Sequence, residues 1–308
     1  MKIAALAGGT GAAKLLRGLS RLMEPGDLTV IGNTGDDTDI WGLHISPDLD
    51  TVCYTLAGLI DDTKGWGLRD ETFHALQQMV RFGEPTWFNL GDRDLATHLH
   101  RSRRLREGHA LSGATATIAR DLGVEQRVIP MSDQPVRTRV LGPDGWRGFQ
   151  EYFVRDKAQV EVRAVVYAGA AAARPAPGVV EAIREARAVI VCPSNPITSV
   201  GPILAVPGIV EALASTEAAV LAISPIVGSD AVSGPAGRLM AAWGLPVSAT
   251  GVARVYAPWL DVLLLDERDR EQAPDIRALG VSAITADIIM ATPEGEVALA
   301  RRALEVLA

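Results

Sequence analysis

Short apolar runs alternate with helical patterns along much of this chain, and this alternation restricts the fold more than any other feature of the sequence. A buried parallel strand is apolar on both faces, and a crossover, usually a helix, must precede the next parallel strand. The pattern therefore predicts an α/β fold with a doubly wound, mostly parallel sheet between two layers of helices. The strand-like runs lie at 28–33, 188–196, 218–228 and 261–269, and the clearest helical patterns at 178–186, 208–215 and 237–244.

The middle of the chain departs from this alternation. Residues 64–122 have mainly helical patterns, whereas 127–155 read as strands, with the turn sequence GPDG at 142–145. We therefore predict a core made of 1–63 and 165–308. The segment 64–164 is predicted to be a mixed helical and β insertion that covers the active site at one end of the sheet.

A glycine-rich turn follows the first apolar run, in the sequence IAALAGGTGAAK at 3–14. The run is typical of a buried strand, and a helical pattern begins at Ala12, so the glycines lie where backbone N–H groups and the helix dipole favour an anion. The spacing fits neither a Walker loop nor a dinucleotide fingerprint. The turn is thus a candidate phosphate site without a named nucleotide, and a tight turn that binds nothing remains the alternative. Its candidate binding residues are Gly8, Gly9, Thr10, Gly11 and Lys14.

Several carboxylates follow the second strand-like run. Asp36, Asp37 and Asp39 lie in TGDDTD, and Asp50 lies in SPDLD, off the apolar stripe of the next predicted helix. Carboxylates repel a neighbouring phosphate unless a hard cation such as Mg²⁺ bridges the two. Asp36, Asp37 and Asp50 are therefore candidate Mg²⁺ ligands, with solvated turn aspartates as the alternative. Asp48 falls in the first turn of that helix and is interpreted as a charge that the helix dipole favours.

Three further clusters carry polar groups. Asp94, Thr97, His98 and Arg101 are spaced to lie on one helical face, where an arginine is a candidate bidentate clamp for carboxylate or phosphate. Two loops follow apolar runs and offer hydroxyl and amide groups that suit phosphate, ribose or base edges, although such loops also occur as plain turns. Their candidate residues are Ser194 and Asn195 in the first loop, and Ser224 and Pro225 in the second.

Composition excludes several classes of function. The chain of 308 residues has 30 Lys and Arg against 37 Asp and Glu, a net charge of −7, so it is a poor non-specific binder of nucleic acid. Its two cysteines, Cys53 and Cys192, lie in apolar runs and are expected to be buried rather than paired or metal-bound. Neither an export signal nor an apolar stretch of about 20 residues is present. We expect a soluble, cytoplasmic protein.

Taken in order, the motifs resemble those of the 2-phospho-L-lactate transferase family, called CofD in archaea and FbiA in actinobacteria. The resemblance spans nearly the whole chain. It is carried by GGTGAAKLLRGL, NTGDD, SPDLDTVCYTL, GWG, LGDRDLATH, MSDQPVRT, PSNPITSVGPIL, SPIVG with VSGPAG, and DERD.

This resemblance implies a Rossmann-like core with an insert, a homodimer, and a step in making the deazaflavin hydride carrier coenzyme F-420. Enzymes of the family transfer a phosphorylated three-carbon acid from a guanosine diphosphate-linked donor to the ribityl hydroxyl of the deazaflavin Fo. GMP leaves and Mg²⁺ is required. The sequence does not distinguish lactate, enolpyruvate and glycerate as the three-carbon unit.

The resemblance also implies roles for particular residues. Asp50, the second aspartate of SPDLD, is expected near the metal and the Fo hydroxyl as the catalytic residue, with Asp36 or Asp37 helping to hold Mg²⁺. Asn89 stands where archaeal members have a lysine that contacts Fo, which puts that contact in doubt. The Gly8 to Gly11 amides, with Ser194 and Asn195, are expected to hold the pyrophosphate. Arg101 or Lys14 is expected to grip the donor carboxylate, and the loop of Ser224 and Pro225 to read the guanine.

Two alternatives come from other functional classes. Gluconeogenesis factors of the YvcK type share a GGTG start and an aspartate-rich second loop, and the resemblance to them implies a nucleotide-sugar-binding regulator without catalysis. LGDRDLATH and SPDLDTVCYTL fit the transferase pattern better. A nicotinamide dehydrogenase is disfavoured because the dinucleotide fingerprint fails and no clear acidic ribose partner follows it.

Overall fold

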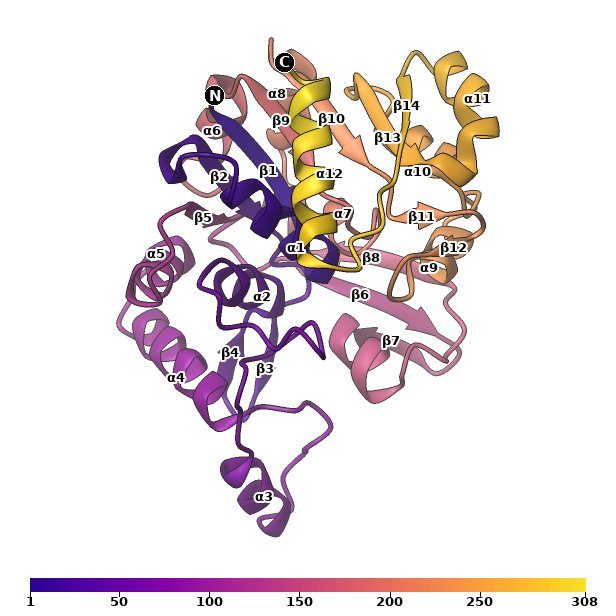
Figure 1. The fold of residues 1–308 in the computed structure, drawn as a ribbon. Helices are drawn as coiled ribbons and strands as arrows, with labels where there is room; N and C mark the ends of the chain where they lie inside the picture. The colour runs from indigo at the N-terminus through magenta and orange to yellow at the C-terminus, as the bar shows by residue number, and fades with distance from the viewer.

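A seven-stranded parallel sheet forms the centre of the molecule (Figure 1). The computed structural model describes residues 1–308. The strand order is β14-β13-β10-β9-β1-β2-β5, and every pair of neighbours is parallel. The predicted doubly wound α/β sheet is thus confirmed. The strands are β1 (Ile3–Ala7), β2 (Leu28–Gly32), β5 (Arg127–Pro130), β9 (Ala188–Val191), β10 (Ala219–Ile223), β13 (Val262–Asp266) and β14 (Ser282–Ala286).

Alternate side chains of the central strands enter two separate cores, one on each face of the sheet. On β1, Ala4 and Leu6 enter the larger core, whereas Ile3, Ala5 and Ala7 enter the smaller one. Because both faces are covered, these strands are apolar throughout. The larger core is covered by α6 (Val179–Glu185), α7 (Val200–Leu204), α8 (Ile209–Ser215), α9 (Ala236–Ala242), α10 (Ala249–Tyr256) and α11 (Ala273–Ala278), and the smaller by α1 (Gly9–Ser20), α2 (Pro47–Leu56), α5 (Leu111–Asp121) and α12 (Pro293–Val306).

The remaining elements lie around one end of this sheet (Figure 1). Helix α3 (His74–Arg81) protrudes from the body, and α4 (Asp92–Arg106) packs beside α5. A three-stranded antiparallel sheet has the order β7-β6-β8, and the predicted GPDG hairpin joins β6 to β7. The strands outside the main sheet are β3 (Thr38–Ile40), β4 (Leu43–Ile45), β6 (Arg137–Gly142), β7 (Gly145–Gly148), β8 (Ala164–Ala168), β11 (Ile226–Val227) and β12 (Asp230–Ala231).

The structure differs from the predicted boundaries of the insertion, 64–164. Strand β5 falls inside that range, yet it extends the parallel sheet at the edge beside β2. Strand β8, placed almost wholly in the predicted core, pairs with β6 in the small antiparallel sheet. The physical reason is strand pairing. The backbone N–H and C=O groups at the outer edge of β2 need hydrogen-bond partners, which β5 supplies, and sequence patterns do not reveal which strands become neighbours. None of the helices is both long and apolar enough to cross a membrane.

Close packing at the turn from β1 to α1 brings two strand-end loops together. A Cβ atom at Gly11 would fall well inside van der Waals contact with the carbonyl oxygen of Pro193, in the loop after β9. Gly9 has a φ of +74°, in the left-handed region that favours glycine. These two glycines therefore allow the first turn of α1 to lie directly against the β9 loop.

We predict that Gly11→Ala destabilises the protein, because the added methyl group must displace backbone rather than a flexible side chain. The free energy of unfolding, measured by urea denaturation, should fall by about 1–3 kcal/mol, as for other overpacked sites. Gly26→Ala is the matched control, since no atom lies within 4 Å of the added Cβ. Its change should stay within about 0.5 kcal/mol. Equal stabilities for the two variants would contradict this account.

Candidate active site

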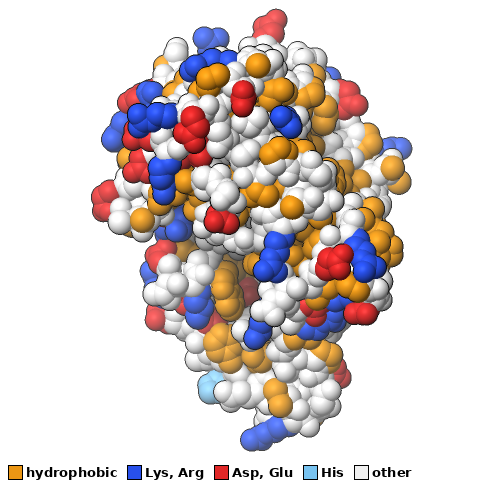
Figure 2. Space-filling view, turned by 90° about the vertical axis from the view of Figure 1, so that its right-hand side faces the viewer, with side chains coloured by type: hydrophobic (Ala, Val, Ile, Leu, Met, Phe, Trp, Pro, Cys, Tyr) orange, Lys and Arg blue, Asp and Glu red, His pale blue; other side chains and the backbone are white.

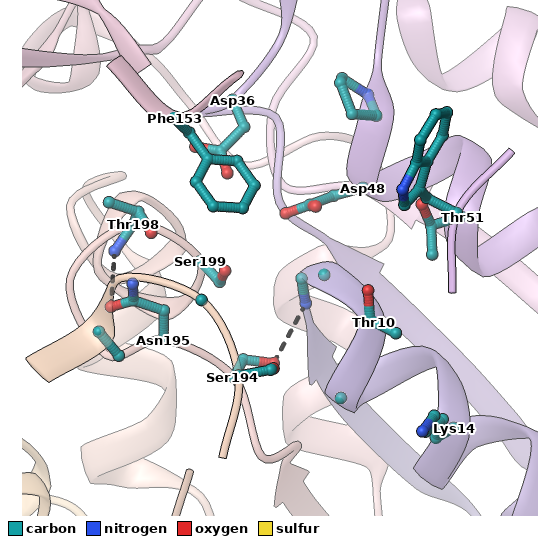
Figure 3. Close-up of a pocket in the computed structure, with 18 of the residues that line it drawn as sticks. Thr10, Lys14, Asp36, Asp48, Thr51, Phe153, Ser194, Asn195, Thr198 and Ser199 are labelled. Atoms are coloured by element: carbon teal, nitrogen blue, oxygen red, sulfur yellow. Dashed lines mark hydrogen bonds between the residues drawn. The ribbon is translucent and has the colours of Figure 1, made fainter. Parts of the chain in front are cut away.

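A cavity of about 790 Å³ opens at the carboxyl edge of the parallel sheet. Its wall includes the loops that follow β1, β9, β10 and β14, together with α2 and parts of the middle segment. Figure 3 shows the side of the wall formed by α1, α2 and the loop after β9. Ligands of open parallel sheets bind at this edge, because the loops leaving neighbouring strands converge there. The cavity is therefore the candidate active site.

The first wall of the cavity is an anion cradle. Gly8, Gly9, Thr10 and Gly11 line it at the start of α1, whose first turn has no side-chain cap and no acidic residue. The first N–H groups of such a helix are not used inside the helix and are available to a ligand. The amide of Gly8 also donates to Ser194 Oγ at 3.4 Å, which joins the cradle to the β9 loop.

The β9 loop is held in shape by Asn195. Its Oδ1 accepts hydrogen bonds from the amides of Ile197 at 2.9 Å and Thr198 at 3.4 Å (Figure 3). Ser194 and Asn195 both line the cavity, so the structure brings them beside the glycine turn as the sequence analysis expects. Asn195 thus shapes the turn through its Oδ1.

Lys14 places a cation in the same wall. Its Nζ donates to the carbonyl of Met290 at 3.1 Å, and it forms no ion pair within 4.0 Å. Ser224 and Pro225 line the cavity, but the Ser224 hydroxyl is engaged in its own turn, donating to Ile226 O at 2.8 Å. Asn89 is an exposed residue of the lining.

Two buried carboxylates of the lining, Asp36 and Asp48, have no cationic side chain as a partner. Asp48 Oδ2 accepts from Asn33 Nδ2 at 2.8 Å, and Asp36 Oδ1 has no hydrogen-bond partner at all. Burial raises the pKa of Asp36 well above its usual range, and the charges of Asp48 and Asp37 add to this. Burial also raises the pKa of Asp48 to about 6, although hydrogen bonds from Asn33 and Gly9 oppose it. The cavity wall thus holds two buried carboxyl groups whose ionised forms no cation of the protein compensates.

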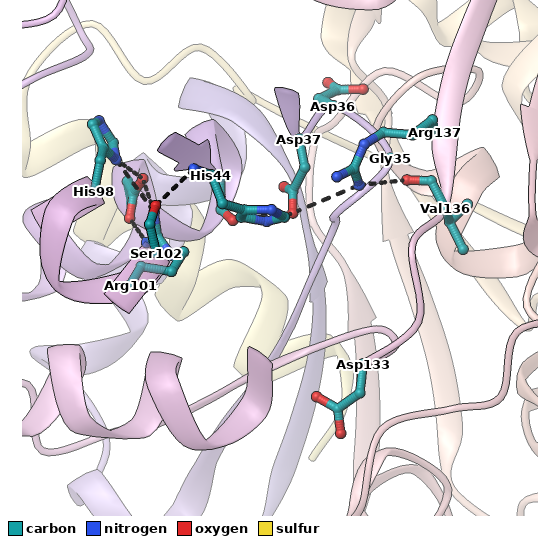
Figure 4. Close-up of polar contacts among 12 residues, drawn as sticks. Gly35, Asp36, Asp37, His44, His98, Arg101, Ser102, Asp133, Val136 and Arg137 are labelled. Atoms are coloured by element: carbon teal, nitrogen blue, oxygen red, sulfur yellow. Dashed lines mark hydrogen bonds and ion pairs between the residues drawn. The ribbon is translucent and has the colours of Figure 1, made fainter. Parts of the chain in front are cut away.

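The structure does not gather Asp36, Asp37 and Asp50 into one open set. Asp37 lies outside the lining and accepts from His44 at 2.8 Å and from Ser46 at 3.0 Å (Figure 4). Asp50 lines the cavity but is paired with a buried arginine. No group of three or more His, Cys, Asp or Glu side chains is arranged to hold a metal ion. Asp48, interpreted from sequence as a helix-start charge, is the carboxylate that shares the wall with Asp36.

Arg101, one of the two residues expected to grip the donor carboxylate, is not part of the cavity lining. It is buried, and its NH1 and NH2 groups donate to the two carboxylate oxygens of Asp50. The helical face of Asp94, His98 and Arg101 is confirmed, but it packs toward α2, so the bidentate clamp closes on the protein's own carboxylate.

Comparison with known proteins decides the family. Residues 3–294 match the family model described as 2-phospho-L-lactate transferase CofD. The chain belongs to the 2-phospho-L-lactate transferase family. It is 44% identical over 312 residues to a phosphoenolpyruvate transferase of Streptomyces griseus, covering 99% of this chain and 98% of that protein. It is 41% identical over 307 residues to a 2-phospho-L-lactate transferase of Methanocaldococcus jannaschii, covering 98% and 97%.

A solved structure agrees on the fold. A member of the UPF0052 family from Bacillus halodurans superimposes with a TM-score of 0.67, at 18% identity and with 98% of both chains covered. At that identity the likeness concerns the fold alone. The family match therefore shows an enzyme of the transferase class, and the solved structure shows only that its fold is shared.

The apolar wall of this transferase family member was not found from the sequence. Phe88, Phe149 and Phe153 line the cavity with Trp66, and the rings of Phe149 and Phe153 stack with centroids 5.5 Å apart. Phe153 lies in a π-helical turn, Glu151–Arg155, a rare conformation found mostly at functional sites. The only signal in the sequence was the aromatic content of GFQEYF, which a strand pattern explains equally well.

We predict a pH-dependent stability from Asp48. Its folded pKa of about 6 exceeds the ordinary value of 3.8, so between these pH values the folded state keeps a proton that the unfolded state has lost. The unfolding free energy of metal-free protein should therefore fall as pH rises through this window. Asp48→Asn removes this titration. As pH rises from 4 to 7, the unfolding free energy of the variant should therefore increase relative to that of the wild type, by on the order of 2 kcal/mol.

The measurement is urea denaturation in a chelating buffer at several pH values across that window. Asp144→Asn is the control, because Asp144 lies in an exposed hairpin turn and its side chain is 90% exposed. The difference in unfolding free energy between Asp144→Asn and the wild type should not vary with pH. If the difference for Asp48→Asn is independent of pH as well, burial of this carboxylate does not oppose its ionisation.

Proposed function

We propose that the protein transfers a phosphorylated three-carbon acid from a guanosine diphosphate-linked donor to the ribityl hydroxyl of deazaflavin Fo, with release of GMP, in coenzyme F-420 biosynthesis. The proposal includes Mg²⁺ as the required metal and a homodimer as the assembly, both of which the family resemblance implies. The observation that carries it is one cavity whose lining combines an anion cradle, unneutralised carboxylates and aromatic rings.

The donor diphosphate fits the cradle. The amides at the start of α1 and the hydroxyl of Ser194 supply hydrogen-bond donors, as anion sites at helix N-termini do. Lys14 is available to the donor carboxylate or to the phosphates because no acidic side chain claims it. Arg101 is not available, since Asp50 occupies its guanidinium. In this proposal the carboxylate of the three-carbon acid is therefore bound by Lys14 rather than by Arg101.

Asp36 and Asp48 fit Mg²⁺. Both are buried, both line the cavity, and Asp36 Oδ1 has no partner within the protein. Mg²⁺ is commonly held by one or two carboxylates and completes its shell with phosphate oxygens and water, so two carboxylates suffice. When bound, the ion supplies charge neutralisation for the phosphates of the donor. Asp50 belongs to this proposal chiefly through its contact with the acceptor.

The acceptor fits the aromatic wall and Asp50. The flat, apolar deazaflavin ring suits the aromatic side chains of Phe149, Phe153 and Trp66, which line the cavity. Asp50 accepts a hydrogen bond from the ribityl hydroxyl and so orients its oxygen. That oxygen forms a bond to the phosphorus that carries the three-carbon acid, the bond from this phosphorus to the diphosphate bridging oxygen breaks, and GMP leaves. The hydroxyl proton passes to Asp50 or to water.

A transfer assay tests the function. Purified protein, Fo and Mg²⁺ are mixed in three parallel reactions with the guanosine diphosphate-linked form of lactate, enolpyruvate or glycerate. The products are resolved by mass spectrometry. We expect one Fo phosphodiester with an equal amount of GMP, and no product when a chelator replaces Mg²⁺. Absence of product with every donor, and no binding of Fo, would instead favour a nucleotide-sugar-binding regulator.

The role of Asp50 is tested by Asp50→Asn, which keeps the shape of the side chain but removes its charge. Turnover should fall by about 10²–10⁴-fold, the range typical of a lost acid–base group, while Fo still binds. Binding is followed by the fluorescence of the deazaflavin, and Asp144→Asn serves as an exposed control with wild-type turnover. An active Asp50→Asn enzyme would remove this residue from the mechanism.

A further inference from the structure

Five polar side chains link α2 to α4 behind the cavity. Asp50 and Tyr54 lie one turn apart on α2, and Asp94, His98 and Arg101 share one face of α4. All of them except Arg101 line the cavity. They form a set of polar contacts that ends at the carboxylate of Asp50, and Figure 4 shows His98 beside Arg101 within it.

The contact at Asp50 is a buried fork. Arg101 NH1 donates to Asp50 Oδ2 at 3.0 Å, and NH2 donates to Oδ1. Arg101 is 1% exposed. Burial alone would lower the pKa of Arg101, but the charge and hydrogen bonds of Asp50 outweigh it and raise that pKa above its ordinary value. Both oxygens of Asp50 are thus tied to one rigid, planar group.

His98 holds that planar group in place. Arg101 NH1 lies 3.3 Å from His98 Nδ1, and because a guanidinium only donates, Nδ1 must be the acceptor. The ring proton then resides on Nε2, which lies 3.2 Å from Asp94 Oδ2, a close contact that lacks hydrogen-bond geometry. The other oxygen of Asp94 accepts from the Tyr54 hydroxyl at 2.6 Å, so Asp94 is fixed from the second helix. Close contacts thus join Tyr54 and Asp94, through His98 and Arg101, to the carboxylate of Asp50.

We propose that Asp94 and His98 are positioning residues for the transfer reaction, which fix the Arg101 guanidinium so that it holds Asp50 as an oriented carboxylate at the acceptor hydroxyl. This inference rests on the proposed function, because the orientation of Asp50 matters only if Asp50 meets the acceptor. Asp94 and His98 then affect turnover through Asp50 and Arg101, without a reacting atom of their own.

A purely structural role explains the arrangement less well. A buried ion pair is weak support for stability, because apolar side chains of similar volume usually stabilise as much or more. A clamp that served only to join two helices would also be sealed from solvent on all sides, whereas this set opens into the cavity through four of its five members. Orientation of Asp50 at the cavity wall accounts for both features.

His98→Ala removes the acceptor of Arg101 NH1. We expect kcat to fall about 10- to 100-fold, the scale of one lost hydrogen bond to a charged group, while the KM values of donor and acceptor stay within about two-fold. In His98→Gln, the side-chain carbonyl can accept from Arg101 again, so most of the lost kcat should return. Arg103→Gln is the control on the same helix, since its side chain is 64% exposed and pairs only with Glu107.

Asp94→Asn provides a second variant in case His98→Ala fails to fold. The asparagine keeps an oxygen for Tyr54, but its amide donates toward His98 Nε2 and favours the tautomer with the proton on Nδ1. Two donors then face each other at Arg101, so kcat should again fall with little change in KM. Thermal unfolding and active-site titration of each variant separate a loss of folded enzyme from a loss of turnover.

The outcomes are distinct. Wild-type kcat in folded His98→Ala and Asp94→Asn overturns the inference and leaves the proposed function intact, and so does a His98→Gln enzyme that is no faster than His98→Ala. A rise in KM that accounts for the whole loss of kcat/KM assigns His98 to substrate binding and also overturns it. A wild-type enzyme without transfer from any donor refutes the proposed function, and the inference with it.

Discussion

The candidate active site depends on the parallel register of β1 with its two neighbours. Ala7 pairs with Gly32 of β2, and Leu6 pairs with Val191 of β9, so three strands end at one level. The glycine turn, the aspartate-rich loop and the serine- and asparagine-containing loop therefore leave the sheet side by side. Gly8 and Gly11 permit this crowding because they have no side chain: a Cβ at Gly11 would clash with the carbonyl oxygen of Pro193, and one at Gly8 would lie 2.7 Å from Asp48 Oδ2.

This crowding collects negative charge, and the protein compensates it unequally. Asp50 receives an arginine and Asp37 a histidine, whereas Asp36 and Asp48 face the cavity without a cation. A buried carboxylate without a partner costs free energy, which appears here as raised pKa values for both groups. These two groups are thus a source of local instability, which the proposed divalent cation would relieve. In this account stability is given up where charge is needed for function, as is common at active sites.

Much of this arrangement could be predicted from the sequence, and the rest could not for identifiable reasons. Apolar runs predict buried parallel strands, and a glycine turn between strand and helix predicts an anion cradle, because both signals are local. Helical spacing correctly placed Asp94, His98 and Arg101 on one face, but spacing does not say which helix that face meets, so Arg101 was assigned to the substrate. The place of Asp48 in the cavity wall was missed for a similar reason, because an aspartate in the first turn of a helix gives no sign that neighbouring loops will bury it.

The central claim, that Asp36 and Asp48 bind a divalent cation together with the donor diphosphate, is tested most directly with Mn²⁺ as a stand-in for Mg²⁺. Electron paramagnetic resonance measures the Mn²⁺ bound to the protein with guanosine diphosphate, and the ³¹P line widths of the nucleotide report whether metal and phosphate are neighbours. The account predicts saturable Mn²⁺ binding that broadens the phosphate resonances and is weakened in both Asp36→Asn and Asp48→Asn. Mn²⁺ binding that neither substitution alters would contradict it.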